Sequence, residues 1–183
     1  MGPSREARHA AALAKVRFEL EGLAARGVVM AGNAFSSVLL LKGERSEADR
    51  EEGLLTGADG GALRAALQAL GYEPQDWAGL ASWDDAGNPL PADLLREAVC
   101  ALDPATLVVC DEAAASLVRE AYADELAARE SFEEAMLAEG LVVQVAGMRV
   151  LALGGFEAAL ADTRQKQVMW RRLKQLPPLG EPY

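Results

Sequence analysis

The sequence contains few residues that could carry redox, metal or nucleophilic chemistry. It has two cysteines and one histidine among 183 residues, and aromatic residues make up only 5% of it. Cys100 and Cys110 form no CxxC motif, and both lie in apolar stretches, where cysteine usually behaves as a small buried hydrophobic residue. We therefore expect two buried thiols, no disulfide, and no resident metal or cofactor.

Long hydrophobic runs are also missing. Charges interrupt every apolar run near the N-terminus, and no stretch approaches the roughly 18 apolar residues of a membrane span. The N-terminus therefore does not resemble a signal peptide, and unpaired thiols suit a reducing compartment. These absences predict a cytoplasmic protein that does not associate with a membrane.

Positive charge is scarce and is concentrated at the two ends of the chain. The net charge is −10, yet residues 1–30 carry +2 and residues 161–183 carry +3, which leaves −15 on residues 31–160. A nucleic-acid binder needs a positive surface that displaces counterions from phosphates, and only the last helix offers one. We expect DNA binding to be weak and to depend on the basic residues of that helix: Arg164, Lys166, Arg171, Arg172 and Lys174.

Apolar residues make up 51% of the chain, enough for one core in a single domain that spans residues 1–183. Four short apolar runs bounded by turn residues are typical of strands covered on both faces. Amphipathic stretches separate these runs, an alternation that predicts parallel strands. We predict an α/β fold, a three-layer α/β/α sandwich with a central four-stranded, mostly parallel sheet whose strands lie near residues 38–42, 79–83, 106–110 and 148–153.

Helix signals lie beside these strands. Residues 4–26 are predicted to form the first helix, with Ser4 as its cap and Gly27 at its end. Asp59 is available to cap the helix that ends at Gly71, and the turn Ala146–Gly147 predicts a hairpin. Further helices are predicted over residues 91–104, 112–127, 131–140 and 161–176, a long polar loop over 43–61, and a tail over 177–183.

Several segments, taken in order, resemble the uracil-DNA glycosylase superfamily, closest to its bacterial and archaeal family-four type. That family has a strand, a GN turn, a strand ending in GE-x-PG, and a loop that leads to a G-x-x-G helix start. The segment VVMAGNAFSSVLLLKGERSEADREEGLLTGADGGAL, from Val28 to Leu63, follows that layout. GNPLPADLLREAVCALDPATLVVCDEAA matches a later turn, helix and strand of the family, and VLALGGFEAALADTRQKQVMWRRLKQL matches its last strand and helix except for the motif HPS.

The resemblance covers residues 28–176 and implies a four-stranded parallel sheet with a cleft at the carboxyl ends of its strands, where open α/β sheets bind ligands. Uracil excision requires a flipped base that is stacked, read at its edge and stabilised as an anion when it leaves. In the family a loop aromatic, a strand Asn, the His of HPS and an acidic residue of the first motif serve these needs. Glu44 matches that acidic residue and is the candidate catalytic group of this chain.

The other family residues are replaced. Ser46 and Glu47 stand for the Pro-Gly that follows the acid, and Leu55 stands at the stacking position. The strand that should bear Asn reads Ala81-Ser82-Trp83-Asp84, so that Trp83 could supply the missing aromatic ring. The resemblance places these candidates in the cleft: Gly43, Ser46, Leu55, Trp83, Asp84, Asn88, Gly154, Gly155 and Phe156.

One of these candidates also fits a structural role, and two family features are missing. Asn88 follows the strand in a turn sequence, and a turn role is favoured for it. Gly154-Gly155-Phe156 replaces HPS, so no histidine stands there to stabilise a departing uracil anion. The one histidine, His9, belongs to the first helix and is expected to be exposed. The four cysteines of the family's iron–sulfur cluster are missing, so we expect no cluster.

Two further groups of residues invite a functional interpretation. The acids of the polar loop lack the spacing of a calcium loop, and a solvated loop is favoured. Gly57, Gly60 and Gly61 lead into a helix but have no basic neighbour that would make a phosphate site.

Three hypotheses therefore stand. The first is a glycosylase-like fold without standard uracil excision, whose cleft binds a nucleobase-like ligand. The second is a divergent active DNA glycosylase that uses Glu44, with Asp84 as a possible helper and the last helix on the DNA backbone. The third is an interaction module that contacts a protein partner through its N-terminal helix.

Overall fold

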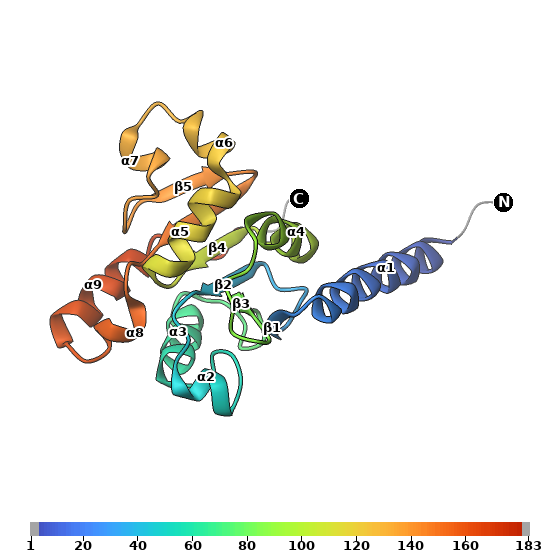
Figure 1. The fold of residues 1–183 in the computed structure, drawn as a ribbon, viewed down its shortest axis with the longest axis horizontal. Helices are drawn as coiled ribbons and strands as arrows, with labels where there is room; N and C mark the ends of the chain where they lie inside the picture. The colour runs from blue at the N-terminus through green and yellow to red at the C-terminus, as the bar shows by residue number, and fades with distance from the viewer. Residues whose placement is uncertain (1–3, 181–183) are drawn as a thin grey trace.

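The protein is an α/β fold built on a six-stranded mixed sheet, seen in a computed structural model that describes residues 4–180 (Figure 1). The strands are β1 (Val28–Gly32), β2 (Val38–Lys42), β3 (Ala78–Asp84), β4 (Thr106–Val109), β5 (Val142–Val145) and β6 (Met148–Ala152). The helices are α1 (Arg5–Ala25), α2 (Glu47–Glu51), α3 (Ala58–Ala69), α4 (Ala92–Leu102), α5 (Glu112–Ala121), α6 (Ala123–Ala127), α7 (Phe132–Ala135), α8 (Phe156–Ala159) and α9 (Thr163–Leu173). The last three residues of the predicted tail, 181–183, lie outside the described part.

The predicted four-stranded sheet is wrong in its number of strands. The sheet has the order β1-β3-β2-β4-β6-β5; the pairs among β3, β2, β4 and β6 are parallel, and β1 and β5 are antiparallel edges. β1 joins because Gly27, at φ +88°, turns the chain after α1 so that Val28 pairs with Asp84. β5 joins because the predicted hairpin, with Ala146 and Gly147 both at positive φ, lays it on β6.

Helices cover both faces of the sheet because successive side chains of each buried strand point to opposite sides. Leu39 and Leu41 pack in a cluster with residues of α1, α4, α5 and α6. Val38 and Leu40 pack in a second cluster with residues of α3, α8 and α9. The three-layer arrangement that results brings the carboxyl ends of the interior strands β2, β3 and β4 together at one end of the sheet.

Three local predictions also require correction. Cys110 is buried as expected, but Cys100 is exposed because it lies on the outer face of α4, whose buried face is formed by its leucines, Ala98 and Val99. The polar loop over 43–61 contains α2, which begins at Ser46 with a reciprocal capping box to Asp49. The helix predicted over 112–127 is divided at Tyr122 into α5 and α6.

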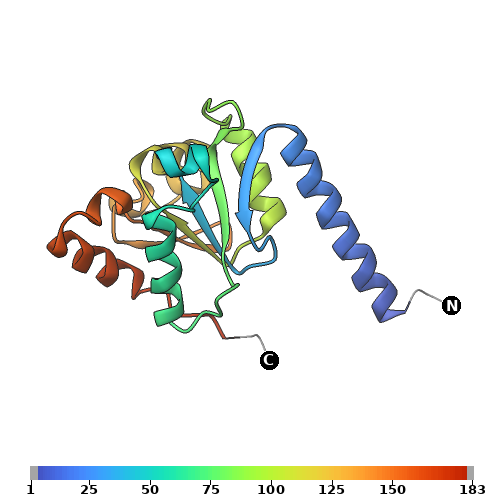
Figure 2. The same cartoon turned by 90° about the horizontal axis from the view of Figure 1, so that it is seen from below.

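The first helix has its predicted bounds and an unexpected position. Ser4 caps α1 through a hydrogen bond from the backbone N–H of Ala7. Only Leu23 of this helix is buried, and the ribbon leaves the body of the protein as a projecting arm (Figures 1 and 2). His9 lies on this arm and is exposed, as expected. Among the described helices, none has both the length and the apolar character that crossing a membrane requires.

Candidate ligand-binding cavity

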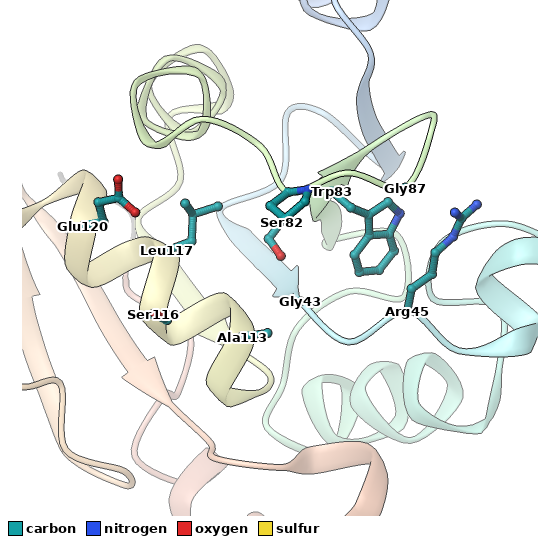
Figure 3. Close-up of a pocket in the computed structure, with 10 residues that line it drawn as sticks. Gly43, Arg45, Ser82, Trp83, Gly87, Ala113, Ser116, Leu117 and Glu120 are labelled. Carbon is teal, nitrogen blue, oxygen red and sulfur yellow. The ribbon is translucent and has the colours of Figure 1, made fainter.

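A cavity of about 320 Å³ opens at the carboxyl ends of β2 and β3, beside α5 (Figure 3). Its walls come from three parts of the chain that are far apart in sequence, which is the usual position of a ligand site in an open α/β sheet. We call it the β3–α5 cavity. Its lining residues are Gly43 and Arg45 after β2, Ser82, Trp83, Gly87 and Pro89 on β3 and its following turn, and Ala113, Ser116, Leu117 and Glu120 on α5.

Trp83 forms the aromatic part of this wall. The residue is 5% exposed, and most of its ring area packs in the core cluster next to α3 and α8. Its strand position is fixed by an antiparallel bridge to Pro89, and Ser82, next to it, contributes a hydroxyl to the cavity. A buried indole is held rigidly, and the small exposed part of its ring gives the cavity an aromatic contact at little cost in conformational entropy.

Arg45 and Glu120 place opposite charges at the two ends of the cavity (Figure 3). The Nε atom of Arg45 is buried, and it has no hydrogen-bond partner among the described residues. The guanidinium lies close against the turn after β3, because a Cβ atom at Gly87 would stand 2.8 Å from its Nη1 atom. A buried donor without a partner is costly, and Arg45, which lines the cavity, is a residue of this wall that can donate to a ligand acceptor.

Asp111 holds the wall between β2 and α5 in place. It follows β4, and its Oδ2 atom accepts hydrogen bonds from the backbone N–H groups of Gly43 and Glu44, both at 2.9 Å. Its Oδ1 atom accepts one from the N–H of Ala114, which makes it the N-cap of α5. The start of α5 is thus neutralised by the protein's own carboxylate, and it is not free to bind an anion.

Lys42 is the last residue of β2 and is 1% exposed. Its side chain points toward α2, α3 and α8, away from α5 and the cavity. Its Nζ atom lies 2.5 Å from Asp49 Oδ2, 2.6 Å from Asp59 Oδ2 and 3.1 Å from Glu157 Oε2. Asp59 was expected to cap a helix, but Gly57 has that position and the Asp59 carboxylate turns inward to Lys42. One ammonium therefore joins β2 to α2, α3 and α8.

Hydrogen bonds in this cluster favour the charged forms of Lys42 and Asp49. Burial alone would lower the pKa of Lys42, but its hydrogen bonds to Asp49, Asp59 and Glu157 outweigh it and raise the pKa above the ordinary value. Burial alone would raise the pKa of Asp49, but hydrogen bonds from Lys42, Ser46 and the Leu55 N–H lower it. Lys42 is therefore a permanently charged structural group and not a nucleophile at neutral pH.

Cys110 is similarly inert. It lies one residue before Asp111 and is buried. Burial raises the pKa of its thiol, and the nearby carboxylates of Asp111 and Asp59 raise it further. The thiolate needed for nucleophilic chemistry is therefore not available at this strand end.

Of the residues expected in the cleft, Gly43 and Trp83 line the β3–α5 cavity. Leu55 does not, because it is fully buried at φ +60° in the core cluster beside α3. Ser46 caps α2, and the candidate catalytic Glu44 has an exposed side chain.

Asp84 and Asn88 form the turn after β3. The Oδ1 atom of Asp84 accepts hydrogen bonds from the N–H groups of Ala86 and Asn88, and the Asn88 carbonyl accepts one from the Asp84 N–H. Asn88 takes part in this turn through its backbone, and the side chain that organises the turn is that of Asp84.

Gly154, Gly155 and Phe156, expected from the resemblance to line the cleft, lie at the end of β6. Gly154 is at φ +94°, and a Cβ atom there would stand 2.6 Å from Glu139 Cδ. Gly155 forms a bridge with Asp111, and Phe156 is buried in the core. These three residues therefore lie at the carboxyl edge of the sheet but do not line the cavity.

The basic residues of α9 and of its C-cap, Lys174, lie in different surroundings. Arg164, Lys166 and Arg171 are exposed. Arg172 is half-buried and donates to Glu139 at 3.3 Å and to the Leu153 carbonyl, so its charge is already compensated. Lys174 lies over the Trp170 ring, 5.5 Å from its centroid.

No family model matches the sequence, and no curated protein matches it. The chemistry of the cavity therefore has to be inferred from its own side chains.

The sequence alone does not assign Lys42, Arg45 or Asp111 to this end of the sheet, and it assigns Asp59 to a helix cap instead of the Lys42 cluster. Two signals were available. Lys42 is a charged residue that ends the apolar run Val38–Leu41, and a lysine there must find buried carboxylates. Asp111 stands between a buried strand and a helix, which is a typical N-cap position.

Proposed function

We propose that this chain is a uracil-DNA-glycosylase-like protein that lacks standard uracil excision and binds a planar, nucleobase-like small molecule in the β3–α5 cavity. The observation that carries the proposal is a cavity with the Trp83 ring in its wall, the positive charge of Arg45 at one end and the negative charge of Glu120 at the other. The volume of about 320 Å³ is near the lower end of small-molecule sites, which suits a base or nucleoside better than a larger cofactor.

The polar groups favour a ligand with acceptors at one end and donors at the other. Arg45 can donate to carbonyl or ring nitrogen acceptors, and Glu120 can accept from amino or ring N–H groups. The hydroxyls of Ser82 and Ser116 serve either kind of partner. A nucleobase offers donors and acceptors around a flat ring, which suits polar groups placed at both ends of the cavity beside the exposed part of the Trp83 ring.

The proposed absence of excision rests on the groups around the cavity. Among the described residues that line it, there is no histidine, asparagine or glutamine. Losing a stabiliser of the leaving anion typically costs about 10²–10³ in rate. Glu44 could orient a water molecule, but a carboxylate repels an anionic leaving base.

Ligand binding can be measured by Trp83 fluorescence in the background W77F/W170F, in which Trp83 is the only tryptophan. We expect titration with free bases and nucleosides of guanine, hypoxanthine, cytosine, uracil and adenine to quench it for at least one of them. Arg45→Gln should weaken that binding by about tenfold, the loss of roughly one charge-assisted hydrogen bond. The matched control Arg50→Gln removes an exposed arginine of α2 and should bind normally. No quenching by any base or nucleoside would disprove the binding proposal.

Catalysis is tested with single- and double-stranded DNA that contains uracil or hypoxanthine. We expect no turnover, or turnover slower than that of ordinary glycosylases by at least the factor of about 10² given above. Turnover at an ordinary rate that is abolished by Glu44→Gln would favour the divergent active glycosylase instead.

A further inference from the structure

The arm formed by the first half of α1 is chemically unlike the rest of the molecule. Residues 4–17 carry four basic side chains and one acidic one, a net +3, so the rest of the chain carries −13. With 21 residues α1 is about 30 Å long, yet only Leu23 is buried. An isolated helix as short as residues 4–17 is marginally stable in water, so packing against a second surface would stabilise the arm.

A groove of about 450 Å³ lies at the root of the arm, between α1 and α4. Phe18, 77% exposed, stands at its outer end, and Gly22 contributes to its lining. Arg26 and Glu97 pair across it at 2.7 Å, so their charges are already compensated. The rest of its lining is apolar or small except for Glu19, and its volume can receive side chains of a helix.

One face of α1 runs from the arm into the groove. Residues that are three or four positions apart are neighbours on a helix surface, and this spacing aligns Ala11, Lys15, Phe18 and Gly22. Gly22 leaves open space around its Cβ position, and Ala11 is small, so another helix can approach closely. Glu19 lies beside Phe18 and is reached by Lys15 of the same helix only at 3.8 Å.

We propose that a second copy of this chain occupies the groove, with the two α1 helices crossing antiparallel near residue 17. In that arrangement Lys15 of each copy lies opposite Glu19 of the other, and Ala11 lies opposite Gly22 or Leu23. The contact is isologous, so each arm fills the groove of the other copy. The basic arm also meets the acidic body of its partner, whereas in a monomer it projects away from its own.

The decisive test uses charge reversal and mixing. Lys15→Glu places carboxylates at positions 15 and 19 of both helices of a dimer, and Glu19→Lys places ammonium groups at the same two positions. Each variant alone should dimerise at least about tenfold more weakly than the wild type, and an equimolar mixture should restore dimers. The measurement is sedimentation velocity of the full chain between about 1 µM and about 200 µM, which covers the weak affinity of a small interface.

The restoration in the mixture separates the proposal from effects within one helix. Repulsion between residues 15 and 19 of one chain is present in both variants and cannot be relieved by mixing. If both variants remain monomeric in the mixture, or the wild type is monomeric at every concentration, the proposal is wrong. Binding of the arm to nucleic acid or anionic vesicles by a monomeric wild type would equally overturn it.

Two exposed phenylalanines supply a matched pair for the apolar contact. Phe18→Asp should weaken dimerisation by at least about tenfold, because Phe18 is placed in the interface. Phe132→Asp changes a residue that is 78% exposed on α7 and should leave the dimer intact. Equal effects of the two substitutions would contradict the assignment of this face.

Cys100 reports directly on the groove. It lines the groove and is exposed, whereas Cys110 is buried. Alkylation of Cys100 by iodoacetamide should slow as the protein concentration rises through the dimerisation range, and should not slow in Phe18→Asp. A rate that is independent of concentration while dimers form would show that the copies meet elsewhere.

Discussion

Lys42 shows how a single residue can fix the edge of a sheet. A lysine ammonium is almost never fully buried unless it is paired, and here three carboxylates from three helices surround it. Removing one member of a buried ion pair leaves uncompensated charge in the interior. The same residue precedes Gly43, so the cluster also steadies the segment that carries Arg45 to the cavity.

The first prediction at this scale concerns Lys42→Met. Methionine fills the space but leaves Asp49 and Asp59 buried without their cation, so we expect the free energy of unfolding to fall by about 3–5 kcal/mol. Urea unfolding followed by circular dichroism measures it. Lys166→Met, which changes an exposed lysine of α9, is the control and should alter stability by less than about 0.5 kcal/mol. Equal stability of the two variants would show that the cluster contributes little.

The second prediction concerns pH. Because hydrogen bonds hold the pKa of Asp49 below its unfolded value of about 3.9, this carboxylate stabilises the fold above that pH and loses its contribution as pH falls through the folded pKa. The stability difference between the wild type and Asp49→Asn should therefore be largest near neutrality and shrink below about pH 4. Urea titrations between pH 7 and pH 3 test this. Glu51→Gln, an exposed change in the same helix, should show a much smaller dependence.

At the scale of elements, α3 illustrates how close packing selects glycine. A Cβ atom at Gly60 would lie 1.8 Å from the Leu55 carbonyl oxygen, whereas one at Gly61 meets nothing within 4 Å. Gly60→Ala should destabilise the protein by about 1–3 kcal/mol through overpacking. Gly61→Ala should stabilise it by about 0.5–1 kcal/mol, because alanine favours the helix. Thermal unfolding of the two variants measures both effects. Changes in stability of the same sign for Gly60→Ala and Gly61→Ala would contradict this packing.

The sequence was informative about elements whose signals are local. The apolar run Val38–Leu41, the cap at Ser4 and the turn Ala146–Gly147 each depend on residues close together in the chain, and the structure has the strand, helix and hairpin that they predicted. The edge position of β1 was missed because it depends on the turn at Gly27 and on pairing with β3, about 50 residues away. The short helix α2 was missed because its acidic residues are typical of a solvated loop.

The site was harder to predict because its contacts join distant segments. Lys42 meets Glu157 across 115 residues, and Asp111 receives the Gly43 N–H across 68. Periodicity shows that these residues end strands or begin helices, but it does not show which strand ends become neighbours. That order is decided by the sheet, in which β2 lies between β3 and β4.

At the scale of the whole molecule, charge governs the encounter with DNA. The body is acidic, and of the predicted α9 contacts Arg172 is already paired with Glu139. We expect duplex DNA to bind more weakly than about 10⁻⁸ M at physiological salt. The residual binding should be lost in Arg164→Glu/Lys166→Glu/Arg171→Glu and kept in Arg50→Glu, as measured by fluorescence anisotropy. Tight binding by the wild type would show that the acidic body is no deterrent.

The two outer strands have a consequence for aggregation. An open sheet edge can recruit a strand from another molecule, the first step toward fibrils. Here β1 has five residues and an irregular register between Val28 and Met30, and β5 has four. The guanidinium of Arg129 also donates to the Gln144 carbonyl, so that carbonyl of β5 is already occupied. Short, interrupted and capped edges of this kind favour a protein that stays dispersed at high concentration and joins other copies through helices rather than through its sheet.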